Sequence, residues 1–238
     1  MVSLRSYMAV AAITKDAARS LLAAACILAA RLAPAADTNA VLDSWFAAQS
    51  NIRTWSAQFT QTRALKSLTQ PLVTTGRLWF AMPNRFRWEL GQPPRTIALG
   101  RADEMFVIYP SLKHAEHYSL GADAPAEWRD ALPLLQAGFP RGRADFTSQF
   151  QILSLTETNA AWHLVLLPRS ASSRKMISSL LIDLAPVDFS LKATELIFAD
   201  GSSMRNDFSN TVSNAALDDS LFQWTPPPDF KVTSPFAK

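Results

Sequence analysis

The sequence predicts a mainly β (α+β) fold in which about eleven antiparallel strands form a meander that curls or closes on itself. Three observations support this prediction. Short runs of residues alternate between apolar and polar, and turn signals rich in proline and asparagine separate the runs. The chain also has only 7 glycines and no internal repeat. With 238 residues, 48% of them hydrophobic, it is long enough for one large domain.

The first 35 residues have the pattern of a secretory signal peptide. Arg5, Lys15 and Arg19 precede an apolar run at 21–30, and Ala33-Pro34-Ala35 follows as a cleavage site. We therefore expect residues 1–35 to be removed on export and residues 36–238 to form a single exported domain. The apolar run is too short to span a membrane.

Removal of this segment changes both the charge and the cysteine content. The whole chain has 23 basic and 20 acidic residues, but residues 36–238 have 19 of each, so charge gives no support for nucleic-acid binding. The only cysteine, Cys26, lies in the apolar run. It is either an ordinary signal-peptide residue, which we favour, or a lipidation site, because residues 22–26 weakly resemble a lipobox.

One helix and then strands are expected along the mature chain. Apolar side chains recur at helical spacing between 41 and 52, with Trp45 on that face. From Trp55 the period changes to two, and we expect strands at 55–62, 73–81, 85–90, 95–99, 105–109, 114–118, 150–156, 161–166, 176–183, 191–198 and 203–208.

The clearest alternation is in the segment 85–90. Arg85, Arg87 and Glu89 alternate with the apolar side chains of Phe86, Trp88 and Leu90. In a strand these two sets point to opposite faces, so one face is expected to be wet and the other to need an apolar cover.

The segment 119–149 interrupts the strands and is expected to supply that cover. Pro125 suits the first turn of a helix, and Trp128, Leu132 and Leu135 follow at helical spacing. Pro133 is expected to end or kink this helix, and Leu135 and Phe139 can continue on a second short turn. A lid and a plain core helix are equally compatible with this pattern.

A search for reactive groups yields no catalytic motif. His114 and His117 are three residues apart in an expected strand, so they point to opposite faces and cannot bind one metal ion together. No nucleophile elbow, phosphate-binding glycine loop or zinc-binding helix motif is present in the sequence. We therefore expect no enzymatic activity, no metal and no cofactor.

The 7 tryptophans and 14 phenylalanines suggest either a filled core or a hollow apolar cavity for acyl chains. Sequence patterns do not separate these two alternatives.

Four motifs occur in order along the chain: Phe59-Thr60-Gln61, the segment 76–80, the segment Pro83–Trp88, and Phe222–Pro227. Together they resemble the LolA family of outer-membrane lipoprotein carriers over almost the whole mature chain. The resemblance implies an incomplete antiparallel β-barrel of about eleven strands, covered by an N-terminal helix and lid helices.

The resemblance also implies a function. Such a carrier receives acylated lipoprotein or lipid cargo from an inner-membrane lipoprotein-releasing transporter and delivers it to an outer-membrane acceptor, as a monomer. Phe86 and Trp88 match the family residues that line the cavity. The full set of residues expected to line it is Trp45, Phe59, Phe86, Trp88, Leu90, Trp128, Leu132, Leu135 and Phe139.

Two features depart from the family pattern. Some members have an arginine before the proline at 83 that latches the lid, whereas this chain has Met82, and Arg85 is one candidate to replace that latch. Members often have Asp-Gly where this chain has Asp103-Glu104. The alternatives are a membrane-anchored lipoprotein acceptor of the same fold, similar to LolB, and a binding module whose barrel is filled by its own side chains.

Overall fold

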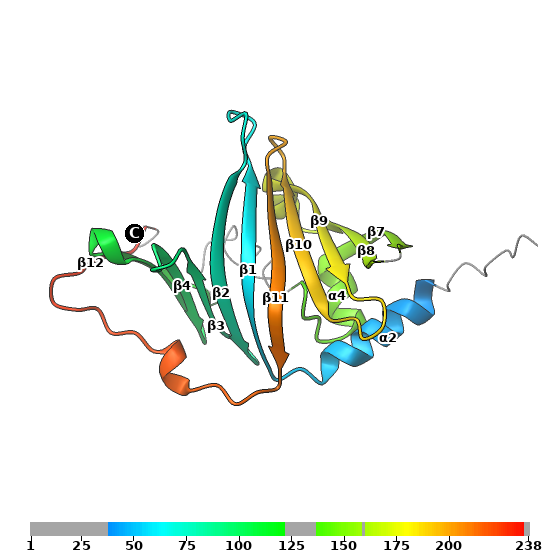
Figure 1. Cartoon of the computed structure of the whole chain (residues 1–238), viewed down its shortest axis with the longest axis horizontal. Helices are drawn as coiled ribbons and strands as arrows, with labels where there is room; N and C mark the ends of the chain where they lie inside the picture. The colour runs from blue at the N-terminus through cyan, green and yellow to red at the C-terminus, as the bar shows by residue number, and fades with distance from the viewer. Residues whose placement is uncertain (1–37, 122–136, 159, 236–238) are drawn as a thin grey trace, which may run out of the picture. The chain divides into compact units, whose positions relative to one another are not determined.

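The computed structural model describes residues 38–121, 137–158 and 160–235. The residues from Thr38 onward form one compact unit. Its twelve described strands belong to one sheet, in the order β12-β6-β5-β4-β3-β2-β1-β11-β10-β9-β8-β7 (Figure 1). Their bounds are β1 (Thr54–Ala64), β2 (Leu72–Ala81), β3 (Arg85–Leu90), β4 (Thr96–Arg101), β5 (Glu104–Tyr109), β6 (His114–Ser119), β7 (Phe150–Glu157), β8 (Trp162–Pro168), β9 (Ile177–Leu184), β10 (Leu191–Phe198), β11 (Ser203–Ser213) and β12 (Lys231–Thr233).

The eleven expected strands are all confirmed, and the sheet is open rather than closed. Neighbouring strands pair antiparallel through the meander from β1 to β6 and through the one from β7 to β11, and β11 then pairs with β1. The sequence reading missed β12, which pairs parallel with β6. Three residues are too few to show a period of two, so no pattern could have revealed this strand.

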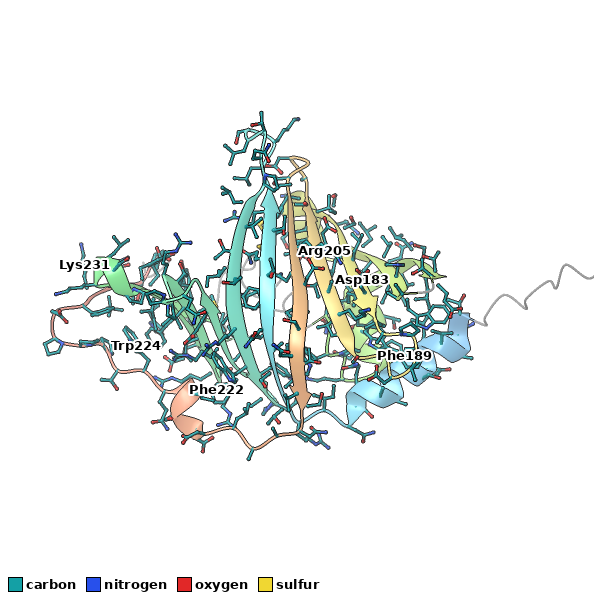
Figure 2. The ribbon with its side chains drawn as sticks, viewed as in Figure 1. Asp183, Phe189, Arg205, Phe222, Trp224 and Lys231 are labelled. Carbon is teal, nitrogen blue, oxygen red and sulfur yellow. The ribbon has the colours of Figure 1, made fainter. Side chains whose placement is uncertain are left out.

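The helix α2 (Thr38–Ser50) begins the described chain, as its spacing predicts. It buries Leu42, Trp45, Phe46 and Gln49, which recur three or four residues apart. Gln49 donates from Nε2 to the carbonyl oxygen of Phe189, 3.1 Å away in the β9–β10 connection (Figure 2). This bond ties the end of α2 to the sheet.

One face of the sheet, here called the inner face, is filled over β8 and β9. Leu164, Leu166, Leu180 and Ile182 are at most 1% exposed, and each such side chain contributes roughly 1.5–3 kcal/mol of hydrophobic stabilisation. The cover comes from α2 and from the helix α4 (Arg143–Gln149). The ring of Phe146 in α4 contacts Trp45 edge-on, with centroids 5.2 Å apart.

The opposite, outer face carries a second apolar cluster over β4–β6. The buried residues there are Leu99, Phe106, Ile108 and Ala115. Trp224 and Phe230 pack on them from the C-terminal segment, residues 214–230. The Trp224 and Phe106 ring centroids are 5.4 Å apart. Figure 2 shows Phe222 and Trp224 on this segment, which leads to β12 at the sheet edge.

The C-terminal segment corrects one expectation about β3. Its charged side was expected to be wet, but the short helix η2 (Asp219–Phe222) lies against it. Arg85 pairs with Asp219 at 2.6 Å and its guanidinium lies over the Phe222 ring, while Arg87 pairs with Glu89 at 2.7 Å. The Arg87–Glu89 pair is largely buried, and the pairing removes the cost that an isolated buried charge would carry there.

Two short helical elements remain. The helix α5 (Ala171–Met176) leads into β9 and η1 (Pro110–Leu112) leads into β6. No helix in the described ranges is long and apolar enough to cross a membrane.

Candidate functional site

The candidate site is the inner face of β1, β2 and β3. The pairing register places Trp55, Phe80 and Phe86 in one row across these strands, because directly paired residues share a face. The next row is Ala57, Leu78 and Trp88, and the third is Phe59, Gly76 and Leu90. Three successive rows are therefore apolar.

Glycines let two of the aromatic rings lie flat against the sheet. The Phe59 ring lies over Gly76 of β2, and the Phe86 ring lies over Gly100 of β4, where any Cβ atom would collide with the ring. This close approach of ring and backbone is a recognised role of glycine in strands. It lets the Phe59 ring reach Trp88, with centroids 4.8 Å apart.

The segment that enters α4 inserts one aromatic ring into this surface. Phe139 stacks on Phe80 with centroids 5.0 Å apart and planes 14° apart, and it meets Trp55 at 5.0 Å. Phe208 of β11 completes the group by contacting Trp55 at 5.2 Å. Phe139 thus covers part of the inner face with the chain's own side chain.

A cavity of about 150 Å³ lies beside Phe139, between the end of α2, the β2–β3 turn and residues 139–141. Its apolar walls include Ile52 and Met82. Ligand pockets usually enclose roughly 300–1,000 Å³, so a long acyl chain needs more room than this cavity offers.

Arg141 holds that segment against the β2–β3 turn. Its Nη2 donates to the carbonyl oxygen of Pro83 at 3.1 Å and to Oδ1 of Asn84 at 2.8 Å. Arg85, the candidate latch suggested by the sequence, faces the other way and binds Asp219 on the outer face. The contact that holds the β2–β3 turn, which includes Met82, thus comes from Arg141, in the segment between β6 and α4. We call this contact the clasp.

The predicted cavity residues fall into three groups. Four are half-buried on or against the inner face: Phe86, Trp88, Leu90 and Phe139. Two are buried: Phe59 is 2% exposed, and Trp45 of α2 is fully buried. Trp128, Leu132 and Leu135 lie outside the described residues. The sequence reading omitted Phe80, Trp55 and Phe208, although their alternation within β2, β1 and β11 placed them in strands.

The inner face becomes polar toward β5 and β6. Glu116 Oε2 accepts hydrogen bonds from the hydroxyls of Tyr118 at 2.7 Å and Tyr109 at 3.4 Å. Burial and the nearby Glu116 carboxylate both raise the pKa of Tyr109 and Tyr118, so both phenols stay protonated at neutral pH. The inner face of β5 still carries Met105 and Val107, so the change to polar side chains is complete only at β6.

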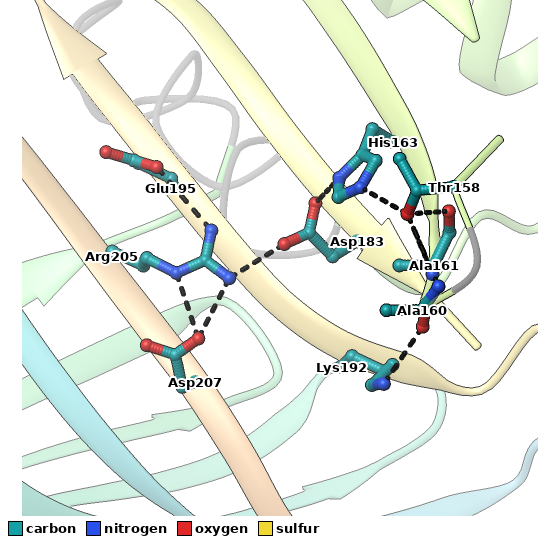
Figure 3. A network of polar contacts seen from close by, with 9 residues as sticks. All are labelled: Thr158, Ala160, Ala161, His163, Asp183, Lys192, Glu195, Arg205 and Asp207. Carbon is teal, nitrogen blue, oxygen red and sulfur yellow. Dashed lines mark hydrogen bonds and ion pairs between the residues drawn. The ribbon is translucent and has the colours of Figure 1, made fainter. Parts of the chain in front are cut away.

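A polar network joins four strands of the outer face (Figure 3). Asp183 Oδ2 accepts from Arg205 at 2.7 Å, and Asp183 Oδ1 lies 2.7 Å from Nδ1 of His163. Burial alone would lower the pKa of Arg205, but its bonds to Asp183 and Asp207 outweigh that effect and raise it. The paired position between these two aspartates is Ala193, whose small side chain leaves room for the guanidinium to cross β10.

This network fits the role of a staple between strands. His163 Nε2 lies 3.1 Å from Thr158 Oγ1, which also bonds to the backbone of Ala161 in the β7–β8 turn. His114 pairs with Tyr109 of the inner face and His117 with Phe106 of the outer face, as the alternation predicts. Within the part of the chain that the structure describes, no group of three His, Cys, Asp or Glu side chains could hold a metal ion.

A second recess, of about 370 Å³, lies on the outer face near the β3–β4 turn. Its walls include Gln58, Thr60, Arg77 and Glu89. These polar side chains suit small polar molecules and not acyl chains, so the aromatic inner face remains the candidate site.

Comparison with known proteins identifies the family. The family described as Outer membrane lipoprotein carrier protein LolA matches residues 50–225. The outer-membrane lipoprotein carrier protein of Dechloromonas aromatica (strain RCB) is 23% identical over 180 residues, which are 74% of this chain and 79% of that protein.

Two solved structures are similar at lower levels. A conserved protein of Thermus thermophilus has 11% identity and a TM-score of 0.48, over 82% of this chain and 98% of that one. A LolA superfamily protein of Nitrosomonas europaea has 12% identity and a TM-score of 0.39, over 76% and 96%. Because the family match covers well over half of its residues, this chain belongs to the LolA family of outer membrane lipoprotein carrier proteins.

Proposed function

We propose that this chain is a periplasmic carrier that shields the acyl chains of lipoproteins, or of a related lipid, on the inner face of β1–β3. It takes them from an inner-membrane transporter to an outer-membrane acceptor, as a monomer and without bond chemistry. Carriers of the LolA family are periplasmic, non-enzymatic binding proteins, which supports the coarser part of this proposal.

The observation that carries the proposal is the aromatic surface of β1–β3, which is buried on β1 and β2, half-buried on β3 and partly covered by Phe139. A surface with three apolar rows needs a cover in water, and the Phe139 ring, on a segment held by Arg141, supplies part of that cover. An acyl chain offers the same apolar cover, and each methylene that it buries contributes roughly 0.8 kcal/mol. Cargo therefore competes with Phe139 for the same surface.

The proposal is tested by titrating the purified protein with a diacylated lipopeptide while recording tryptophan emission. The control ligand is the same peptide without acyl chains. We expect saturable emission changes with the lipopeptide alone, because Trp88 and Trp55 line the proposed surface. Equal responses to both peptides, or no response to either, would refute acyl-chain binding.

A membrane-anchored acceptor of the same fold is distinguished by its N-terminus. Mass spectrometry of the protein from its native host that found a diacylated Cys26 would replace the carrier with the acceptor. A mature N-terminus at Ala36 is the expected result.

A further inference from the structure

The hairpin of β1 and β2 carries a group of exposed apolar side chains beyond the end of the sheet. Residues 65–71 connect the two strands, and Leu68, Leu72 and Val73 are 46%, 48% and 62% exposed. Leu72 pairs with Arg63, on the inner face, and Val73 pairs with Thr62, on the outer face. The hairpin is therefore uncovered on both faces, and Figure 1 shows it rising past its neighbours.

A further apolar side chain, from another element, lies at the same end of the sheet. The β10–β11 turn is adjacent, because Ala64 at the end of β1 pairs with Ser203 at the start of β11. Met176 at the end of α5 is 41% exposed, and its carbonyl oxygen accepts from the N–H of Ala199 in that turn at 2.8 Å. We call this surface the hairpin end. It consists of Leu68, Leu72, Val73 and Met176 and the basic residues Arg63, Lys66, Arg174 and Lys175.

The hairpin end is basic. Arg63, Lys66, Arg174 and Lys175 are all exposed there, and Asp200 is the acidic residue of the adjoining turn. Residues 44–88 contain no Asp or Glu at all. Hydrogen bonds from Ser202 lower the Asp200 pKa, and the pairing of Ala64 with Ser203 places this turn beside residues 65–71.

Among the hairpin connections between strands, basic residues are concentrated at this end of the sheet. Five hairpin connections lie at this end of the strands: 65–71, 91–95, 110–113, 169–176 and 199–202. Together they contain six basic residues and one acidic residue. Four hairpin connections lie at the opposite end of the strands: 82–84, 102–103, 158–161 and 185–190. They contain two acidic residues and no basic residue.

We propose that the hairpin end binds directly to a membrane surface that contains anionic lipid. The apolar side chains enter the boundary between headgroups and acyl chains, and the basic side chains contact lipid phosphates. A projecting hairpin with apolar residues on both faces suits a fluid surface, which can surround it. A protein partner would need a pre-formed groove, and a stable protein interface buries about 800 Å² on each side.

Direct contact would bring the inner face close to the bilayer in which the transporter or the acceptor lies. Leu72 and Arg63 lie on the same face as Phe59 and Trp88, further along β1 and β2. An acyl chain leaving that face at this end of the strands would meet the membrane that the hairpin contacts. The membrane contact itself does not depend on what cargo the inner face holds.

The test is flotation of the purified protein with vesicles of phosphatidylcholine alone or of phosphatidylcholine with phosphatidylglycerol. We expect flotation with the anionic vesicles, and weaker flotation at high salt because salt screens exposed charges. The Leu68→Asp/Val73→Asp variant should lose at least tenfold in vesicle affinity. Lys66→Glu should lose about fivefold or more, since one basic residue near an anionic surface contributes about 1 kcal/mol.

The matched control is Val187→Asp. This valine is 92% exposed and lies in the β9–β10 connection, at the opposite end of the strands. It should float like the unmodified protein. The proposal is overturned if the unmodified protein does not float, if the hairpin variants float equally well, or if Val187→Asp is as impaired as they are. Lipopeptide titration of the same variants separates the two proposals, because loss of flotation with normal lipopeptide binding affects the hairpin end alone.

Discussion

Trp88 lies on the inner face with a paired residue on each flanking strand. A substitution there is the most informative single test of the proposed binding surface. Trp88 pairs with Leu78 and Ala98 on the flanking strands, and its ring contacts Phe59. The residue is half-buried, so a change there alters the proposed binding surface more than the core.

We expect Trp88→Glu to remain folded and to reduce lipopeptide binding at least tenfold. A carboxylate among apolar rows must either stay hydrated or be buried at a cost of several kcal/mol, and both disfavour an acyl chain. Tryptophan emission titration measures the affinity. The matched control is Trp79→Glu on the outer face of β2, opposite Arg87, which should bind normally. Normal binding by Trp88→Glu would exclude this face as the site.

Arg141 is expected to control how readily Phe139 leaves the inner face. The Arg141→Ala variant loses both hydrogen bonds to the β2–β3 turn, which at this exposed position contribute about 1 kcal/mol. Hydrogen exchange at residues 137–141 should become faster, and lipopeptide should associate faster.

Arg85→Ala serves as the control, because it breaks an ion pair of the outer face and leaves this segment untouched. Equal exchange at residues 137–141 in the unmodified protein and in Arg141→Ala would show that the clasp does not hold the segment.

At the scale of elements, the C-terminal segment gives the sheet a second covered face. Phe222 is 2% exposed against β3, and Trp224 and Phe230 close the cluster over β4–β6. The sheet is therefore packed on opposite faces in different regions, with α2 and α4 inside and the C-terminal segment outside. The stretch of β1–β3 between these regions is left to the aromatic surface.

We expect Phe222→Ala to lower the free energy of unfolding by about 3 kcal/mol, the usual loss for a buried phenylalanine. Urea denaturation followed by far-UV circular dichroism measures this change. Leu112→Ala, at a leucine that is 71% exposed, should change stability by less than about 0.5 kcal/mol. A similar small loss for Phe222→Ala would mean that the segment does not cover the outer face.

Local periodicity explains how much of these elements could be predicted. The strands from β1 to β11 follow from alternation, and α2 follows from helical spacing, because both depend on neighbours in the sequence. The helices α4 and α5 have 7 and 6 residues and lie between strands, so they offer too short a pattern. The packing of Phe222 on β3 joins residues more than a hundred positions apart, which a single sequence does not encode locally.

The site was predictable only in part for the same reason. The alternation at 85–90 and the family resemblance both selected the face of Phe86, Trp88 and Leu90. The presence of Phe139 on that face depends on contacts with β1 and β2 from a distant loop. Trp45 satisfied the helical pattern, but its complete burial under α2 makes it part of the packed core.

The whole molecule is one open sheet whose regions have different roles. The filled inner face of β7–β10 and the covered outer face of β4–β6 provide stability. The aromatic inner face of β1–β3 is the proposed cargo surface, and the hairpin end is the proposed membrane contact. Cargo binding and membrane binding can therefore be removed separately by mutation.

Native mass spectrometry of the protein purified from its own host shows whether the aromatic inner face holds acyl chains. We predict a noncovalent ligand that organic extraction identifies as acyl-bearing, and its absence from Trp88→Glu purified in the same way. A protein that is empty and also takes up no added lipopeptide would contradict the account, since the inner face would then be a core filled by its own side chains.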